Sequence, residues 1–289
     1  AFKVHVHTDT PGEALTEAAK YGTLELAKIE NMRTQAEELA AGKKAQSTDD
    51  LDAIEEELES AENAVAAPEK RYGFLAVCAG DGLAATFRDL GVDRIVSGGQ
   101  TMNPSTQAIL QEVNHTPSEV VFVLPNNKNI IMAAEQCVRL SDKKVIIIPT
   151  RTVPQGISAM LMFDETASAD ENQMTMLSAA ENVETAQVTF AARDSEVDGK
   201  PIKQGEIMGL CNGKIKYIGD DITDIAVKAA HKLFKKGEHS LITIIYGEGA
   251  SEDDAEAVEK ALYEKYGNDV EISIVNGGQP IYYFIISVE

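Results

Sequence analysis

Four short apolar runs, each followed by a turn and a helical stretch, constrain this 289-residue chain most strongly. They cover residues 73–78, 94–96, 120–124 and 145–148. Strands without polar alternation must be buried on both faces, and strands that alternate with helices usually pair in parallel. We therefore expect residues 71–155 to form a doubly wound α/β subdomain, whose parallel sheet is covered by helices on both faces.

Residues 156–289 follow a different pattern. Helices are expected at 157–162, 170–184, 222–235 and 253–266, and strands at 188–192, 207–211, 214–218, 241–246, 270–275 and 281–288. Glycine-containing turns join the earlier strands, as in antiparallel pairing. This predicts a second subdomain of the α+β class with a mixed sheet.

The first 70 residues read as an incomplete domain and a linker. Residues 1–44 predict a strand at 2–6, a helix at 12–20 and a strand at 24–29, which is too little to fold alone. Because the chain opens with Ala1 inside a strand pattern, we expect a fragment that lacks its N-terminal portion. Residues 45–69 hold nine acidic residues and no basic ones, which predicts an acidic linker over 45–70. Apolar residues recur there at helical spacing, so an amphipathic helix within the linker stays open.

Charge and cysteine content limit the classes of partner. The net charge of −21 disfavours nucleic acid and anionic membranes and favours a partner or ligand that carries positive charge. The three cysteines are widely spaced, which is typical of reduced thiols in the cytoplasm. With no apolar run near the length of a membrane span, we expect a cytoplasmic protein without membrane insertion.

One motif order occurs twice in the chain. A strand, the triplet Gly80-Asp81-Gly82, a helix and a strand lead to Val96-Ser97-Gly98-Gly99-Gln100. The same order later joins Gly247-Glu248-Gly249 to Val275-Asn276-Gly277-Gly278-Gln279. Glycine is common in turns, so coincidence stays open, but the matched order favours two related subdomains.

Small polar residues gather after the apolar strands, where open parallel sheets bind ligands. Helix N-termini there can hold an oxyanion, and an arginine could add a full charge. The alternative is that Ser and Asn only cap helices. The candidate ligand site consists of Gly99, Gln100, Thr101, Asn103, Ser105, Asn126, Asn127 and Arg151.

Two weaker signals concern nucleotide and metal chemistry. The segment from Gly80 to Leu83 lacks the third glycine of a dinucleotide fingerprint, and the sequence has no Walker motif. We therefore reject a dinucleotide site and a Walker-type phosphate loop. His5 and His7 share one face of a strand, roughly 7 Å apart, which suits phosphate contact, acid–base catalysis or metal binding. A metal would need a third ligand, and surface histidines remain the plainer interpretation.

Longer strings resemble a known family. Residues 3–12 (KVHVHTDTPG) and 29–32 (IENM) resemble the middle domain of the fatty acid kinase A subunit. Four further segments resemble the C-terminal domain of the same subunit: residues 96–106 (VSGGQTMNPST), 124–129 (LPNNKN), 149–156 (PTRTVPQG) and 276–280 (NGGQP). The resemblance extends over essentially the whole chain.

The resemblance implies two DegV-like subdomains preceded by a β-α-β remnant of the middle domain, which carries the family's dimer interface. It implies that His5 and His7 belong to a catalytic cluster completed by an upstream cysteine. The loop of Asn103, Pro104 and Ser105 resembles a degenerate form of the carrier's carboxylate-binding loop, so the candidate ligand site would be a vestigial carboxylate site. ATP and magnesium would bind the missing N-terminal domain, and no cofactor is expected in this chain. The partner would be a DegV-like fatty-acid-binding B subunit, and a homodimer through the middle domain is a further expectation.

Three functions follow. The leading hypothesis is a docking module for the lipid-loaded B subunit, inactive by itself, while the missing domain phosphorylates the acyl carboxylate. The alternative is a fatty-acid-binding protein of DegV type in its own right. The third is an enzyme that uses His5 and His7, for which no nucleotide or metal motif is visible.

Overall fold

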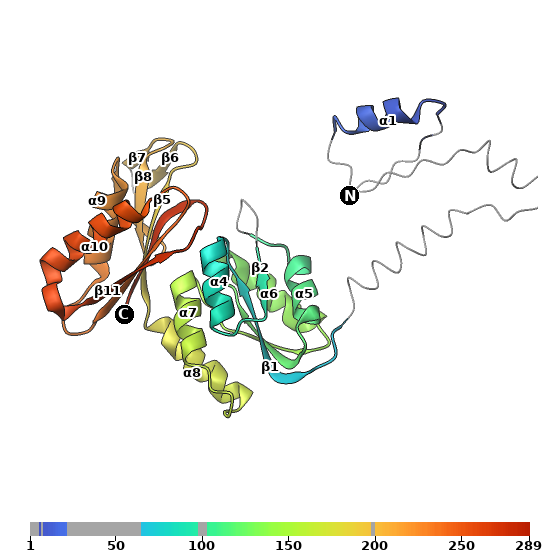
Figure 1. Ribbon diagram of the computed structural model, residues 1–289, viewed down its shortest axis with the longest axis horizontal. Coiled ribbons are helices and arrows are strands. Elements are labelled where there is room, and N and C mark those ends of the chain that lie inside the picture. Colours follow the sequence, from blue (N-terminus) through green and yellow to red (C-terminus); the bar gives the residue numbers. More distant parts are fainter. Residues whose placement is uncertain (1–5, 7, 22–64, 98–102, 198–199) are drawn as a thin grey trace, which may run out of the picture. The chain divides into compact units, whose positions relative to one another are not determined.

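The computed structural model describes residues 6, 8–21, 65–97, 103–197 and 200–289 (Figure 1). The chain divides into two compact units, residues 1–61 and 62–289, which are considered separately. In the first unit, helix α1 (Pro11–Ala18) starts with proline, which is tolerated in a first helical turn. The predicted strands at 2–6 and 24–29 and nearly all of the acidic linker lie outside the described residues.

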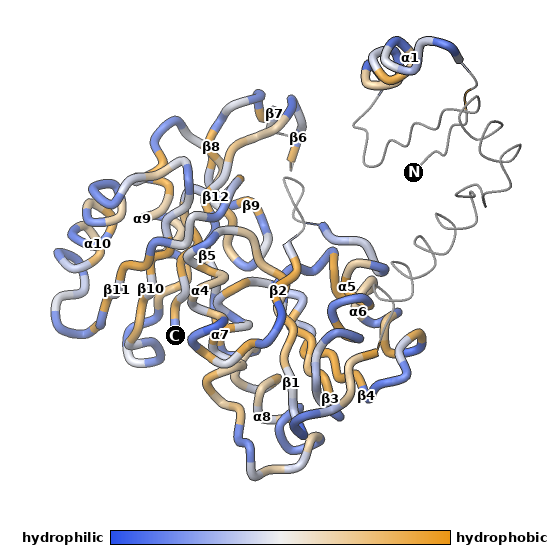
Figure 2. Tube along the Cα trace, turned by 45° about the vertical axis from the view of Figure 1, so that its right-hand side comes forward, coloured by the Kyte–Doolittle hydropathy of each residue, from blue (hydrophilic) through white to orange (hydrophobic). Residues whose placement is uncertain are grey.

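A four-stranded parallel sheet opens the second unit, as the apolar runs predicted. The strands are β1 (Lys70–Val77), β2 (Arg94–Val96), β3 (Ser118–Leu124) and β4 (Lys144–Ile147), in the order β2-β1-β3-β4. All neighbouring pairs are parallel. In Figure 2 these strands are largely hydrophobic, in contrast to the hydrophilic loops around them.

Helices cover both faces of this sheet. These helices are α4 (Asp81–Asp89), α5 (Thr106–His115), α6 (Lys128–Leu140), α7 (Val153–Leu161) and α8 (Ala169–Glu181). Alternate residues of β1 enter different cores: Leu75 packs with α5 and α6, whereas Phe74 packs with α4, α7 and α8. Every side chain of the strand interior is therefore buried, which explains the unbroken apolar run.

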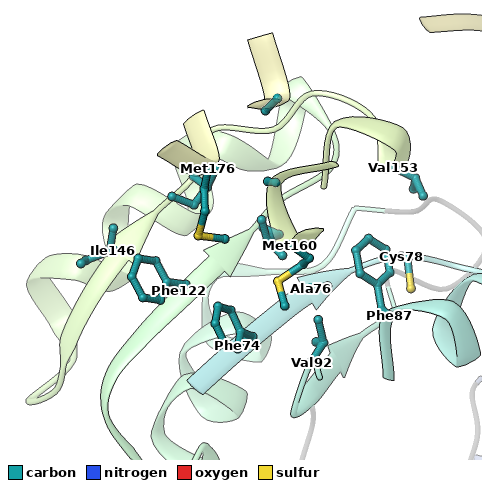
Figure 3. Close-up of a cluster of buried hydrophobic side chains, with 14 of the residues drawn as sticks. Phe74, Ala76, Cys78, Phe87, Val92, Phe122, Ile146, Val153, Met160 and Met176 are labelled. Carbon is teal, nitrogen blue, oxygen red and sulfur yellow. The ribbon is translucent and has the colours of Figure 1, made fainter. Parts of the chain in front are cut away.

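The core on the α7 and α8 side is aromatic and contains methionine (Figure 3). Phe74 and Phe122 stack with ring centroids 5.6 Å apart, and Phe163 meets Phe74 edge-on at 4.7 Å. Met160 and Met176 fill the remaining space. The same cluster includes Ile245 and Ile285 of the next sheet, so a continuous apolar core joins the two sheets.

The second sheet is mixed, as predicted. Its strands are β5 (Glu184–Phe190), β8 (Ile207–Cys211), β9 (Lys214–Gly219), β10 (Leu241–Tyr246), β11 (Glu271–Asn276) and β12 (Tyr282–Val288), in the order β11-β10-β12-β5-β8-β9. Only β10 and β11 pair in parallel among these six strands. Helices α9 (Ile222–Leu233) and α10 (Glu252–Tyr266) pack on this sheet, and the 3-10 turn η2 (Gly267–Asp269) follows α10.

Some predicted bounds were wrong. The helix expected at 157–162 begins at Val153, because Pro154 lies in its first turn, where its missing N–H costs nothing. The helix expected at 170–184 ends at Glu181, and β5 begins at Glu184. A hairpin of β6 (Ser195–Val197) and β7 (Lys200–Ile202) was not predicted, since its strands are three residues long and β6 is largely polar and exposed. The subdomain boundaries at 44, 70 and 155 stay predictions.

Candidate functional site

Asn126 joins the carboxyl ends of three strands of the parallel sheet. Its side chain is 7% exposed, and its backbone has a φ of 55°, a conformation that asparagine tolerates. The amide nitrogen Nδ2 donates to the carbonyl of Val77 at 3.0 Å, and Oδ1 accepts from the hydroxyl of Thr150 at 2.9 Å. A Cβ on Gly156 would lie 2.1 Å from Oδ1. The amide of Asn126 is thus engaged inside the protein.

Two other predicted residues cap helices. Oγ of Ser105 accepts the N–H of Ala108 at 3.1 Å at the start of α5, and Oδ1 of Asn127 accepts the N–H of Asn129 at 2.9 Å at the start of α6. The alternative of simple capping therefore describes their hydrogen bonds. A ligand at either place would have to compete with a helix N–H.

The remaining predicted residues are more scattered. Arg151 is exposed, and its backbone N–H donates to Oε1 of Gln155 at 2.8 Å. Asn103 is described and exposed, just before α5. The structure brings Asn126 and Asn127 to one small cavity, whose lining includes neither Ser105 nor Arg151. Gly99, Gln100, Thr101, His5 and His7 lie outside the described residues.

The cavity beside Asn126 and Asn127 is too small for a ligand. It measures about 10 Å³, close to the room for one water molecule, and Cys78 is part of its lining. Burial raises the pKa of the Cys78 thiol to about 12, so this thiol is no nucleophile at neutral pH. A fatty acid tail would require rearrangement of the residues that line this cavity.

The Gly80-Asp81-Gly82 turn at the start of α4 is filled by the chain itself. Gly80 has a φ of 107°, and a Cβ added there would lie 2.4 Å from the carbonyl oxygen of Gly277. A Cβ on Gly82 would lie 1.9 Å from the carbonyl oxygen of Asn276. The N–H of Leu83 donates to the Gly277 carbonyl at 3.1 Å. These glycines permit close approach of the β11–β12 connection at the helix N-terminus where a phosphate would otherwise bind.

A larger cavity, which the sequence did not lead us to expect, lies beside the second triplet. It measures about 320 Å³ and is lined by Phe190, Glu248, Gly249, Ile281, Tyr282 and Tyr283. The signal that could have indicated it is the repeated motif order, because Gly247-Glu248-Gly249 follows β10 as Gly80-Asp81-Gly82 follows β1. The β10-α10-β11 unit and the β1-α4-β2 unit both place their two strands in parallel.

Two other kinds of feature are absent from the described ranges. Among these residues, no group of three His, Cys, Asp or Glu side chains is placed to hold a metal ion. In the same part of the chain, no helix is long and apolar enough to span a membrane.

Comparison with known families identifies the chain's relatives. Residues 73–289 match the C-terminal domain of the FakA-like family, whose members resemble the A subunit of fatty acid kinase. Residues 1–39 match the middle domain of the same family. The chain belongs to the FakA-like family. The resemblance drawn from the motifs is thereby confirmed.

Curated relatives of this FakA-like chain are longer. Protein YloV of Bacillus subtilis is 40% identical over 287 residues, which cover 99% of this chain and 49% of YloV. A Staphylococcus haemolyticus protein, SH1689, is 38% identical over 287 residues, 99% of this chain and 50% of its own length. The chain thus spans about half the length of the curated relatives it matches.

Solved structures of DegV family proteins share the fold. Cg2579 from Corynebacterium glutamicum superposes with a TM-score of 0.54 at 14% identity, covering 75% of this chain and 96% of Cg2579. A DegV family protein from Thermus thermophilus, described by its fatty acid binding, also superposes with a TM-score of 0.54, at 13% identity. The match covers 76% of this chain and 99% of the Thermus protein. At these identities the likeness concerns the fold, and it confirms the predicted class of two α/β parts.

Proposed function

We propose that residues 71–289 of this FakA-like chain dock a fatty-acid-loaded carrier of the DegV family. The complete protein would then phosphorylate the acyl carboxylate, with ATP and magnesium bound by a domain N-terminal to this chain. His5 and His7 would contribute to catalysis in the middle domain, which would also form a homodimer.

The observation that carries this proposal is the closed state of the Gly80-Asp81-Gly82 turn in a chain of this family. Phosphoryl transfer needs donors that surround the phosphates and a metal. At α4 the N–H of Leu83 is already satisfied by the Gly277 carbonyl. This region therefore supports recognition better than nucleotide binding, and family membership supplies the substrate class.

Titration calorimetry of the chain with a lipid-loaded DegV-like carrier from the same organism tests the proposal. We expect saturable one-to-one binding with a Kd in the micromolar range, corresponding to about −8 kcal/mol. An unrelated fatty-acid-binding protein loaded with the same lipid is the control and should give no heat. Absence of binding to the DegV-like carrier at about ten times that concentration would contradict docking.

A second candidate, lipid binding by this chain itself, is favoured by its DegV-like fold. Native mass spectrometry of the chain purified from bacteria separates the two. A stoichiometric fatty acid that co-purifies would favour lipid binding, whereas the docking proposal expects the bare polypeptide mass. Acyl phosphate formed from ATP by this chain alone would contradict both and support the enzyme hypothesis.

A further inference from the structure

The 320 Å³ cavity lies at one end of three central strands of the six-stranded sheet, where β5 and β10 end and β12 begins. Its walls are mainly apolar and aromatic. Phe190 and Tyr283 approach with ring centroids 6.0 Å apart at 59°, and a Cβ on Gly249 would lie 2.5 Å from the Tyr283 ring. Phe190 is 39% exposed, which is high for such a large apolar side chain.

One wall residue is held in a strained backbone conformation. Ile281 has a φ of 72°, and the N–H of Tyr282 donates across it to the carbonyl of Pro280 at 2.8 Å. This is the rare γ-turn with a positive central φ, which costs free energy for a β-branched residue. The hydroxyl of Thr189 donates to the Ile281 carbonyl at 2.7 Å and holds the turn. Ile281 is 38% exposed and lines the cavity.

Charge then selects the kind of occupant. Glu248 is the one charged residue among the described residues that line the cavity. It is exposed, and its carboxylate makes no hydrogen bond or ion pair with the part of the chain that the structure describes. Three further carboxylates follow in the first turn of α10, at Glu252, Asp253 and Asp254. A fatty acid carboxylate or a phosphate would be repelled here, whereas a cation would be attracted.

We infer that this cavity receives an arginine side chain from the protein that docks on this region, an inference that rests on the proposed function. A guanidinium group stacks on aromatic rings, as Phe190 and Tyr283 would allow, and forms paired hydrogen bonds with a carboxylate such as Glu248. Its three-carbon stem suits the apolar wall at Ile281. The net charge of −21 favours a basic surface on the partner.

The first test compares two charge-neutralising variants by calorimetry with the DegV-like carrier. Glu248→Gln removes the carboxylate from the cavity, and Glu256→Gln removes an exposed carboxylate of α10 that does not line it. Both change the net charge by the same amount. We expect Glu248→Gln to weaken binding about tenfold, a loss of 1.4 kcal/mol, and Glu256→Gln to stay within about twofold. Equal effects of the two variants overturn the inference and leave docking intact.

A third variant, Phe190→Leu, separates arginine from an apolar occupant. It removes the ring but keeps an apolar side chain, so a stacked guanidinium should lose affinity severalfold. If Phe190→Leu weakens binding while Glu248→Gln does not, the cavity takes an apolar side chain and the inference is wrong. Circular dichroism and unfolding midpoints confirm that each variant is folded.

A direct probe keeps the inference testable should the carrier fail to bind. Acetyl-Gly-Arg-Gly-amide is titrated into the isotope-labelled chain and followed by NMR, with acetyl-Gly-norleucine-Gly-amide as the apolar control. We expect saturable shifts at the amides of Glu248, Gly249 and Tyr283 for the arginine peptide, which Glu248→Gln abolishes. No such shifts, or equal shifts with the norleucine peptide, overturn the inference whatever the carrier does.

Discussion

The Gly80-Asp81-Gly82 and Gly247-Glu248-Gly249 turns follow equivalent strands of two β-α-β units, and glycines of both turns are closely packed, yet of the two it is the second that borders the larger cavity. At the first turn, the backbone of Gly277 and its neighbours lies so close that an added Cβ would overlap it. At the second turn, a Cβ on Gly247 would likewise lie 2.3 Å from the carbonyl oxygens of Gln279 and Tyr282, but Glu248 and Gly249 border a cavity of about 320 Å³. The two turns share glycine spacing and an acidic middle residue, so the sequence of the triplet does not decide whether a cavity lies beside the turn.

The connection between β11 and β12 accounts for the difference. Its first residues fill the turn at α4, and the carbonyl of Gln279 then accepts the N–H of Glu248 at 3.1 Å. The Gln279 side chain is fully buried, and its Nε2 donates to the carbonyls of Ile245 and Tyr282 at 3.2 and 3.4 Å. One segment therefore closes the first turn and supports the second. The contact at the first turn joins the two sheets, and the cavity beside the second turn is where we propose recognition.

Gly80→Ala is the most severe way to break the closed turn. The variant incurs the cost of a positive φ and places a Cβ 2.4 Å from the Gly277 carbonyl oxygen. Gly91→Ala is the matched control, since Gly91 has a φ of 91° but no atom of the described residues within 4 Å of an added Cβ. We expect Gly80→Ala to lower the free energy of unfolding by about 1–3 kcal/mol more than Gly91→Ala does. Urea unfolding measures both, and equal losses would show that the packing against Gly277 is unimportant.

Gln279→Met tests the segment that both turns share. Methionine has a similar length, but it leaves the carbonyls of Ile245 and Tyr282 without their donor, which should cost about 1–3 kcal/mol. The loss of the buried Oε1, which has no hydrogen-bond partner among the described residues, offsets part of this cost. Gln204→Met on the exposed surface is the control, with a change of about 0.5 kcal/mol or less. A neutral Gln279→Met would mean that the buried amide does not hold the segment.

Ser251→Ala sharpens the contrast between the two helix starts. Ser251 and Asp254 form a reciprocal capping box at α10, whereas α4 has no side-chain cap and receives the Gly277 carbonyl instead. Ser251→Ala should cost about 1 kcal/mol. Asp81→Asn at the start of α4 should cost a few tenths of a kcal/mol through the helix dipole alone. The comparison fails if Asp81→Asn destabilises the protein as much as Ser251→Ala in urea unfolding.

Much of the fold could be predicted because its signals are local. The apolar runs indicated the parallel sheet, and the bounds of β8 and β10 were predicted correctly. The β6–β7 hairpin was missed because its short strands carry no apolar alternation over a useful length. The end of α8 was missed because Asn182 and Val183 separate helix and strand without glycine or proline.

The candidate site was less predictable because its chemistry depends on distant contacts. An asparagine after a strand can cap, bind a ligand or bridge strands, and only the positions of Val77 and Thr150 reveal that Asn126 bridges. In the same way, glycine is needed at positions 80 and 82 because the backbone at Gly277, far along the chain, packs against them. The strained turn at Ile281, which shapes the cavity, has no sequence signature of its own.

The thiol of Cys78 lies two residues before the closed turn, in the core on the α7 and α8 side of the parallel sheet. Burial raises the pKa of its thiol from 9.0 to about 12, so at pH 8 its thiolate fraction is lower than that of an unfolded cysteine by about 10³. Cys137 and Cys211 are also buried, with raised pKa values. We therefore expect almost no reaction of the native protein with iodoacetamide at pH 8. Because the folded state retains a proton that the unfolded chain loses above pH 9, stability should fall as the pH rises from about 9 toward 12.

The thiols of Cys78 and Cys137 together report where the molecule opens. Cys78 lies in the core beside the closed turn, while Cys137 lies on α6, on the other face of the parallel sheet. Gly80→Ala should therefore accelerate the labelling of Cys78 more than that of Cys137, as read by mass spectrometry of the alkylated peptides. Gly91→Ala should leave the ratio of the two rates unchanged. If Gly80→Ala accelerates both thiols equally, the closed turn opens only with global unfolding, and its contact with Gly277 is as stable as the core itself.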